Sequence, residues 1–128
     1  MGTIDTNIDL ERDIVTHTVS GEITAGDIRD RISSYYEGEV TGLVLWNFSN
    51  ADIGSISASD VRDLVELTNE HAKRRLGGKT AAVFSSSSAY GMGRMFELSK
   101  EVDDRGIGHA SFRDLKAALE WLGVTTGD

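Results

Sequence analysis

The chain contains no cysteine and no proline among its 128 residues. Without cysteine it can form neither a disulfide scaffold nor a thiolate zinc site, and it has no cysteine nucleophile. Long apolar runs are also missing, since the longest, 43–46 and 81–84, have four residues each, whereas a membrane-spanning helix needs about 20. We therefore do not expect an integral membrane protein.

Basic residues are in deficit, with 13 Lys and Arg against 21 Asp and Glu and a net charge of -8. Because Lys and Arg supply the affinity for phosphate backbones, we expect no nucleic-acid partner. The same acidic balance leaves at most transient association with an anionic membrane surface. Residues 1–13 are polar and acidic, unlike a signal peptide, which predicts a cytoplasmic location.

The pattern of apolar residues predicts a single domain over 1–128, with 124–128 as a frayed tail. Alternating or continuous apolar runs predict strands, which we place at 3–9, 13–20, 40–48, 80–84 and 107–112. Apolar residues at helical spacing predict helices, which we place over 28–36, 61–72, 92–102 and 115–122. Strands and helices thus alternate after an opening hairpin.

Such alternation requires crossover connections and therefore a mostly parallel sheet. We predict an α/β fold, a five-stranded mostly parallel sheet with an antiparallel first strand and four helices. Strands in sequential order keep every crossover short and right-handed, so we expect that order.

Three predicted helix starts share a hydroxyl residue followed three positions later by an acid: Thr24–Asp27, Ser57–Asp60 and Ser111–Asp114. In a capping box the hydroxyl accepts a hydrogen bond from a free helical N–H, and the acid accepts one from the capping residue. We therefore interpret these acids as helix caps rather than catalytic groups.

Loops that leave the carboxyl ends of parallel strands are the usual ligand-binding edge of such sheets. Two predicted loops lie there, the polar segment 47–59 and the serine run 85–88. The helix after the serine run has no acidic cap, so its N–H groups and positive dipole end are free to meet an anion. The serines could equally serve only as caps, and this alternative stays open.

Residues just after the serine run could complete such a site. Arg94 could extend back toward the helix start, and Tyr90, with Met92, Met95 and Phe96, could line an apolar cavity or simply pack in the core. We predict a binding site for a small amphipathic or anionic ligand, formed by Asn47, Asp52, Ser85, Ser86, Ser87, Ser88, Tyr90 and Arg94.

Familiar catalytic and metal-binding motifs are missing from the sequence. His17, His71 and His109 lie in different predicted elements, without the spacing of metal ligands. No nucleophile elbow, P-loop or dinucleotide motif occurs. We expect no metal, no cofactor and no enzymatic activity; the alternative is an active site that tertiary structure assembles from Asp52, His109 and the serine run.

The cations Lys73, Arg74, Arg75 and Lys79 form the one basic cluster in the sequence. The first three fall in the last turn of a predicted helix, where cations interact favourably with the helix dipole. We interpret them as a helix terminus, with an anionic partner as the alternative.

The order of elements, the polar loop after the central strand and the ending 110–122 together resemble the STAS/SpoIIAA-like family. Segment 89–96 is similar to one in uncharacterised, stand-alone members. The resemblance covers essentially the whole chain. It implies a small α/β domain whose relatives act as anti-sigma factor antagonists, as cytoplasmic modules of anion transporters, or as stand-alone proteins related in fold to lipid-binding domains. Membership of this family does not imply enzymatic activity for any of these relatives.

In phospho-switched relatives a serine follows an acidic residue at the start of the helix after the central strand. The matching stretch here is 54–60, in which Ser57 lies nearest that position, although Ile56 precedes it in place of an acid. The alternative function is therefore a regulatory protein of the anti-sigma antagonist type, with a protein partner and a switch by phosphorylation of Ser57.

Overall fold

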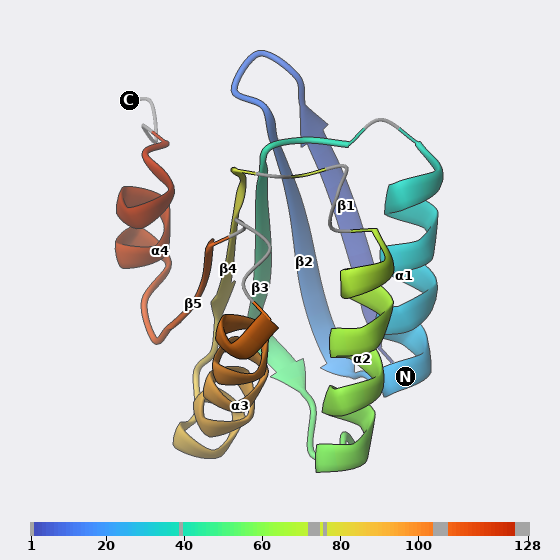
Figure 1. Cartoon of the computed structure of the whole chain (residues 1–128). Coiled ribbons are helices and arrows are strands. Elements are labelled where there is room, and N and C mark those ends of the chain that lie inside the picture. The colour runs from blue at the N-terminus through green and yellow to red at the C-terminus, as the bar shows by residue number, and fades with distance from the viewer. Residues whose placement is uncertain (1, 39, 72–74, 76, 104–107, 125–128) are drawn as a thin grey trace.

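The computed structural model describes residues 2–38, 40–71, 75, 77–103 and 108–124 (Figure 1). Along these residues the elements are β1 (Thr3–Asp9), β2 (Ile14–Glu22), α1 (Ala25–Glu37), β3 (Leu43–Asp52), α2 (Ala58–Glu70), β4 (Lys79–Val83), α3 (Ser87–Asp103), β5 (Gly108–Phe112) and α4 (Leu115–Leu122).

The strands form one sheet in the order β1-β2-β3-β4-β5. β1 pairs antiparallel with β2, and the remaining neighbours pair in parallel. The predicted fold class and strand order are thus confirmed. Because β3 and β4 point the same way, the segments that lead to α2 and α3 leave the sheet at the same end (Figure 1).

Alternation of side chains divides the sheet into two faces. On β3, Val44, Trp46 and Phe48 belong to the larger apolar cluster, which includes residues of α1, α2 and α3. Leu45 points the other way and packs in a smaller cluster with Ala118 of α4. The sheet therefore separates a layer of three helices from a layer formed by α4 (Figure 1), and we call the first side the three-helix face.

The loop predicted to begin at Asn47 is shorter than expected. β3 continues to Asp52, which pairs with Glu22 of β2, so only residues 53–57 connect the strand to α2. A register shift between Thr18 and Ser20 accommodates this polar extension, and Asn47 Oδ1 accepts a hydrogen bond of 3.0 Å from Ser49 N. Backbone pairing with a neighbouring strand thus outweighs the polar composition that predicted a loop.

Two of the three predicted capping boxes are confirmed and one is wrong. Thr24 and Ser57 each accept a hydrogen bond from the N–H three residues later, while the acid at that position bonds back. At α4 the N-cap is Asp114 itself, whose side chain accepts from Lys116 N. Ser111 is not available as a cap because it lies in β5, opposite Ala82.

The predicted basic helix terminus is also wrong where the structure describes it. α2 ends at Glu70, with His71 as its C-cap and no basic residue in its last turn. Arg75 is buried, and Lys79 donates to Trp121 O at 3.1 Å. Residues 73 and 74 lie outside the described residues.

The chain end was expected to fray from residue 124. Gly123 adopts φ 80° and caps α4, and Val124 N donates to Leu119 O at 3.1 Å. Val124 also packs against the smaller apolar cluster. The rest of the expected tail, 125–128, lies outside the described residues.

Candidate functional site

The predicted site residues on β3 are engaged in local structure. Asn47 pairs in register with Val83 and, by alternation, points to the face opposite Trp46. Asp52 ends the strand, and its Oδ1 accepts a hydrogen bond of 2.9 Å from Gly54 N. Asp52 therefore lies at the carboxyl edge as predicted, whereas Asn47 lies within the sheet.

The serine run 85–88 follows β4 as predicted, but α3 begins earlier than expected, so Ser87 and Ser88 belong to the helix and only Ser85 and Ser86 precede it. Its first turn contains no acidic residue, and Ser86 Oγ accepts a hydrogen bond of 3.2 Å from Ala89 N. Sequence reasoning missed Arg113, which follows β5 and donates to Ser85 O at 3.0 Å and to Ser87 Oγ at 3.3 Å. The predicted parallel pairing of the last two strands could have revealed Arg113, because it puts the residue after β5 beside the residues after β4.

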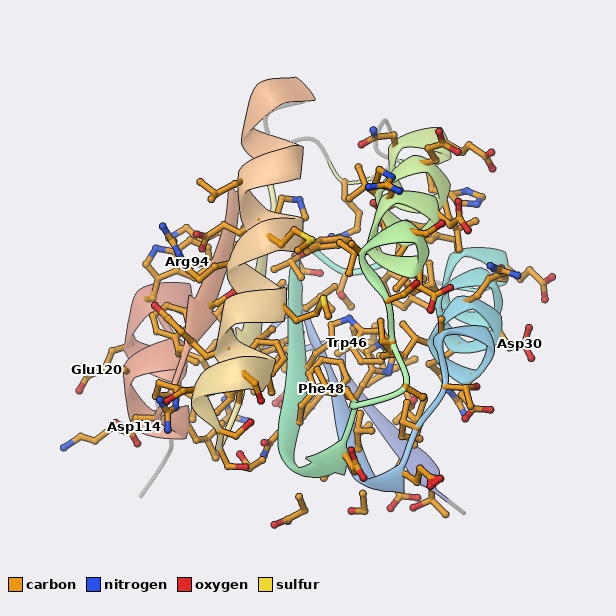
Figure 2. The ribbon with its side chains drawn as sticks, turned by 90° about the horizontal axis from the view of Figure 1, so that it is seen from below. Asp30, Trp46, Phe48, Arg94, Asp114 and Glu120 are labelled. Atoms are coloured by element: carbon orange, nitrogen blue, oxygen red, sulfur yellow. The ribbon has the colours of Figure 1, made fainter. Side chains whose placement is uncertain are left out.

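Tyr90 and Arg94 leave the start of α3 in different directions. Tyr90 is half-buried and packs against the larger apolar cluster. Arg94 was expected to extend back toward the serines, but it forms an ion pair with Glu97, one turn further along. Figure 2 shows Arg94 on the side of α3 that faces away from Trp46 and Phe48.

A cavity of about 140 Å³ lies between the three-helix face of the sheet and α1, α2 and α3. Its floor is a row of aromatic rings, in which Trp46 and Phe48 stack at 5.6 Å and Phe48 and Phe84 stack at 5.3 Å. Leu64 and Phe96 are among the helical residues that line it. None of the eight predicted site residues lines this cavity.

Two small residues, Ala82 and Gly93, line the cavity. Ala82 presents a short side chain beside Trp46 of β3 and Ser111 of β5. At Gly93 a Cβ atom would lie 2.3 Å from Phe84 Cε2 and 2.9 Å from Ser111 Oγ, so α3 packs directly against the Phe84 ring and β5. Of the predicted apolar stripe on α3, Met92 and Phe96 line the cavity, whereas Met95 is 40% exposed.

His17 is part of the cavity wall and is 1% exposed. Its Nδ1 is hydrogen-bonded to Thr6 Oγ1 at 2.9 Å, and its ring lies 4.2 Å from that of Trp46. Burial, reinforced by the nearby Arg31 guanidinium, lowers the pKa of His17 to about 4. The ring is therefore neutral at neutral pH.

Glu97 also lines the cavity and is 4% exposed. Its Oε1 accepts a hydrogen bond of 2.9 Å from Ser111 N, and its Oε2 pairs with Arg94. The negative charge of Glu97 is thus matched by a cation of the same helix.

Arg75 brings a positive charge to the cavity wall and is 6% exposed. Nε donates to Thr41 O at 3.0 Å, Nη2 donates to Gly42 O and Lys79 O at 3.0 Å each, and Nη1 donates to Thr80 Oγ1 at 2.9 Å. The sequence could not reveal this role, because these acceptors come from the starts of two different strands.

The groups of the alternative active site are not brought together. His109 lies at the start of β5, in register with Thr80 and, through it, with Val44. Asp52 follows Val44 by eight residues on β3, which corresponds to roughly 25 Å along the sheet. In the part of the chain that the structure describes, no three His, Asp or Glu side chains are grouped so that they could hold a metal ion.

Ser57 is exposed at the N-terminus of α2. Its Oγ accepts a hydrogen bond of 3.1 Å from Asp60 N, and its N–H donates to Asp60 Oδ2 at 2.9 Å. These hydrogen bonds lower the pKa of Asp60, so its carboxylate is ionised beside the hydroxyl.

No family model and no curated protein matches the chain. Solved structures do match it over almost its whole length. An anti-sigma factor antagonist from Mycobacterium paratuberculosis is similar with a TM-score of 0.67 and 14% sequence identity, covering 96% of this chain and 95% of that one.

A second structure with the SpoIIAA-like fold is an uncharacterised protein of the DUF3478 family from Shewanella loihica PV-4. It matches with a TM-score of 0.58 and 17% identity, covering 94% of this chain and 93% of that one. The chain has the SpoIIAA-like (STAS) fold. The architecture implied by the resemblance is thus confirmed. None of the described helices has the length and apolar character needed to span a membrane.

Proposed function

We propose that the chain is a non-catalytic binding module that takes a small amphipathic ligand into the cavity beneath α2 and α3. The cavity itself carries the proposal. Its volume of about 140 Å³ is close to the roughly 150 Å³ of an apolar cavity that binds benzene. Mostly apolar and aromatic walls with a few polar groups are typical of small-molecule sites.

The proposed site is the cavity and not the predicted edge, although the two lie next to each other. Phe84 lines the cavity and directly precedes Ser85, so the carboxyl end of the cavity lies beside the serine run. The nearly parallel rings of the floor give the cavity an aromatic surface against which a compact apolar body can pack.

Indole and toluene are suitable neutral probes, because each has about the size of the cavity and carries no charge. We expect either probe to raise the melting temperature of the chain, since a ligand at 100 times its Kd adds about 2.7 kcal/mol of stability. The substitution Ala82→Ile should abolish the effect by filling the space, whereas Ser86→Ala at the edge should leave it unchanged.

Two results contradict the proposal. One is a melting temperature that neither probe changes, even in a saturated solution of the probe. The other is a shift that survives in Ala82→Ile but disappears in Ser86→Ala, which would place the ligand outside the cavity.

A regulatory switch is the second candidate function. Ser57 is exposed at a helix N-terminus, where a phosphate group is electrostatically favoured, although the Asp60 carboxylate opposes it. The fold is that of a solved anti-sigma factor antagonist. Intact-mass analysis and co-purification from the native cell test this candidate: we expect one added phosphate that Ser57→Ala removes, together with a regulatory protein partner. An unmodified mass and no partner contradict it.

A further inference from the structure

Arg75 is a buried cation whose hydrogen bonds all lead to uncharged groups. Its acceptors are three backbone carbonyls and one hydroxyl. Among the described residues no carboxylate forms an ion pair with it. Burying a charge without a counter-charge is unfavourable, so a complementary anion at this place would stabilise the protein.

One donor of Arg75 remains for such an anion. A guanidinium carries five N–H groups, and the four hydrogen bonds to protein acceptors use all but one, which belongs to Nη1. Nη1 is also the atom that bonds Thr80, and both residues line the cavity.

Thr80 supplies a second donor next to the first. Its Oγ1 accepts from Arg75 Nη1 at 2.9 Å, which leaves its own O–H to donate, and no described residue accepts from it. Thr80 Oγ1 and Arg75 Nη1, which each keep one unused donor, therefore lie 2.9 Å apart on residues that line the cavity.

The other charge on the cavity wall does not compete for this place. Glu97 is paired with Arg94 and bonded to Ser111, which lies opposite Ala82 and thus two residues further along β4 than Thr80. The cavity is therefore polarised, with its cationic end at the start of β4 and its aromatic floor extending toward Phe84.

We propose that Arg75 and Thr80 bind the carboxylate of a compact monocarboxylate whose apolar body occupies the aromatic part of the cavity; this rests on the proposed binding function. Two adjacent donors match the two oxygens of one carboxylate, whereas a phosphate group presents more acceptor oxygens than these donors can satisfy. Because the cavity is lined mostly by apolar side chains, the attraction between the two charges is stronger there than in solution.

Phenylacetate and phenylacetamide test this proposal because they share one shape and differ in charge. Their Kd values for the full chain are measured at pH 7 and constant ionic strength by the fluorescence of Trp46, which lies in the floor, with chemical shifts as a second readout. We expect phenylacetate to bind at least tenfold more tightly than phenylacetamide.

Variants test whether Arg75 and Thr80 cause the difference in Kd between phenylacetate and phenylacetamide. Thr80→Val keeps a β-branched residue in the strand, and Arg75→Lys keeps the charge but loses the planar fork. Each should weaken phenylacetate about tenfold and leave phenylacetamide unchanged. Arg113→Gln, at the exposed edge beside the serine run, is the matched control and should change neither Kd.

The possible outcomes distinguish failure of the carboxylate anchor from failure of the proposed binding function. If neutral indole and phenylacetamide bind but phenylacetate binds no more tightly, the carboxylate anchor is wrong while the cavity remains a binding site. If no probe binds, the binding function fails and the anchor with it. If selectivity for phenylacetate disappears in Arg113→Gln and persists in both cavity variants, the anion binds at the edge and the proposal is overturned.

Discussion

Filling the cavity from its floor should make the protein more stable. Ala82 lines the cavity, and the substitution Ala82→Ile adds three carbon atoms there. Isoleucine is β-branched and therefore suits a strand. At about 0.8 kcal/mol for each buried CH₂, the gain is about 2.4 kcal/mol, reduced by about 0.5–1 kcal/mol for lost side-chain freedom. We expect a net stabilisation of about 1.5 kcal/mol, or roughly 6 °C in Tm.

The neighbouring residue provides the control. Ala81 is fully buried on the opposite face, packed with Ala118 and Leu122, and it lines no part of the cavity. Ala81→Ile should therefore overpack the smaller cluster and destabilise the protein by about 1–3 kcal/mol.

Urea unfolding followed by circular dichroism measures both variants, with the midpoint at constant m-value reporting the change in free energy. Opposite signs are expected for the two substitutions on one strand. If Ala82→Ile is destabilised as much as Ala81→Ile, the space beside Ala82 is not there and the reasoning about the cavity is refuted.

Four further substitutions test other parts of the structure. Gly91→Ala should stabilise the protein by about 0.5–1 kcal/mol, because the added Cβ meets nothing within 4 Å. Gly93→Ala should destabilise it by about 1–3 kcal/mol, because the added Cβ would meet an aromatic ring at 2.3 Å. Urea unfolding compares the two variants. Tyr35→Phe removes the oxygen that accepts from Thr41 N at 2.7 Å and should destabilise the protein by about 1–3 kcal/mol. The pKa of His17, lowered from 6.5 to about 4, means that the unfolded chain binds the proton first as pH falls. The stabilisation that the buried neutral ring gives to the folded state is thus fully present above pH 6.5 and is lost as pH falls toward 4, so the free energy of unfolding is about 2 kcal/mol lower at pH 5. His17→Phe should remove this loss from the pH profile of unfolding.

Each of these expectations has a contrary outcome. Equal effects at the two glycine positions would mean that Gly93 does not pack closely against the Phe84 ring. An unchanged unfolding midpoint in Tyr35→Phe would mean that the Thr41 N–H reaches water. A His17 ring that titrates near pH 6.5 in the folded protein, as followed by NMR, would contradict its burial against Trp46.

Much of the architecture follows from the sequence alone. Strands and helices were predicted because burial imposes a period on the apolar residues, and the boxes at Thr24 and Ser57 because a cap needs only residues within one turn. Strand order followed from the short connections, since alternating elements leave few ways to wind a sheet.

Tertiary structure decided the candidate site. Arg75 looked like a helix terminus in the sequence, yet its guanidinium lies among acceptors from residues 41, 42, 79 and 80, which only strand pairing brings together. The cavity likewise brings together Trp46 of β3, Ala82 of β4 and Phe96 of α3, which lie far apart in the chain. Volume and charge compensation depend on residues far apart in the chain, so no local pattern reveals them.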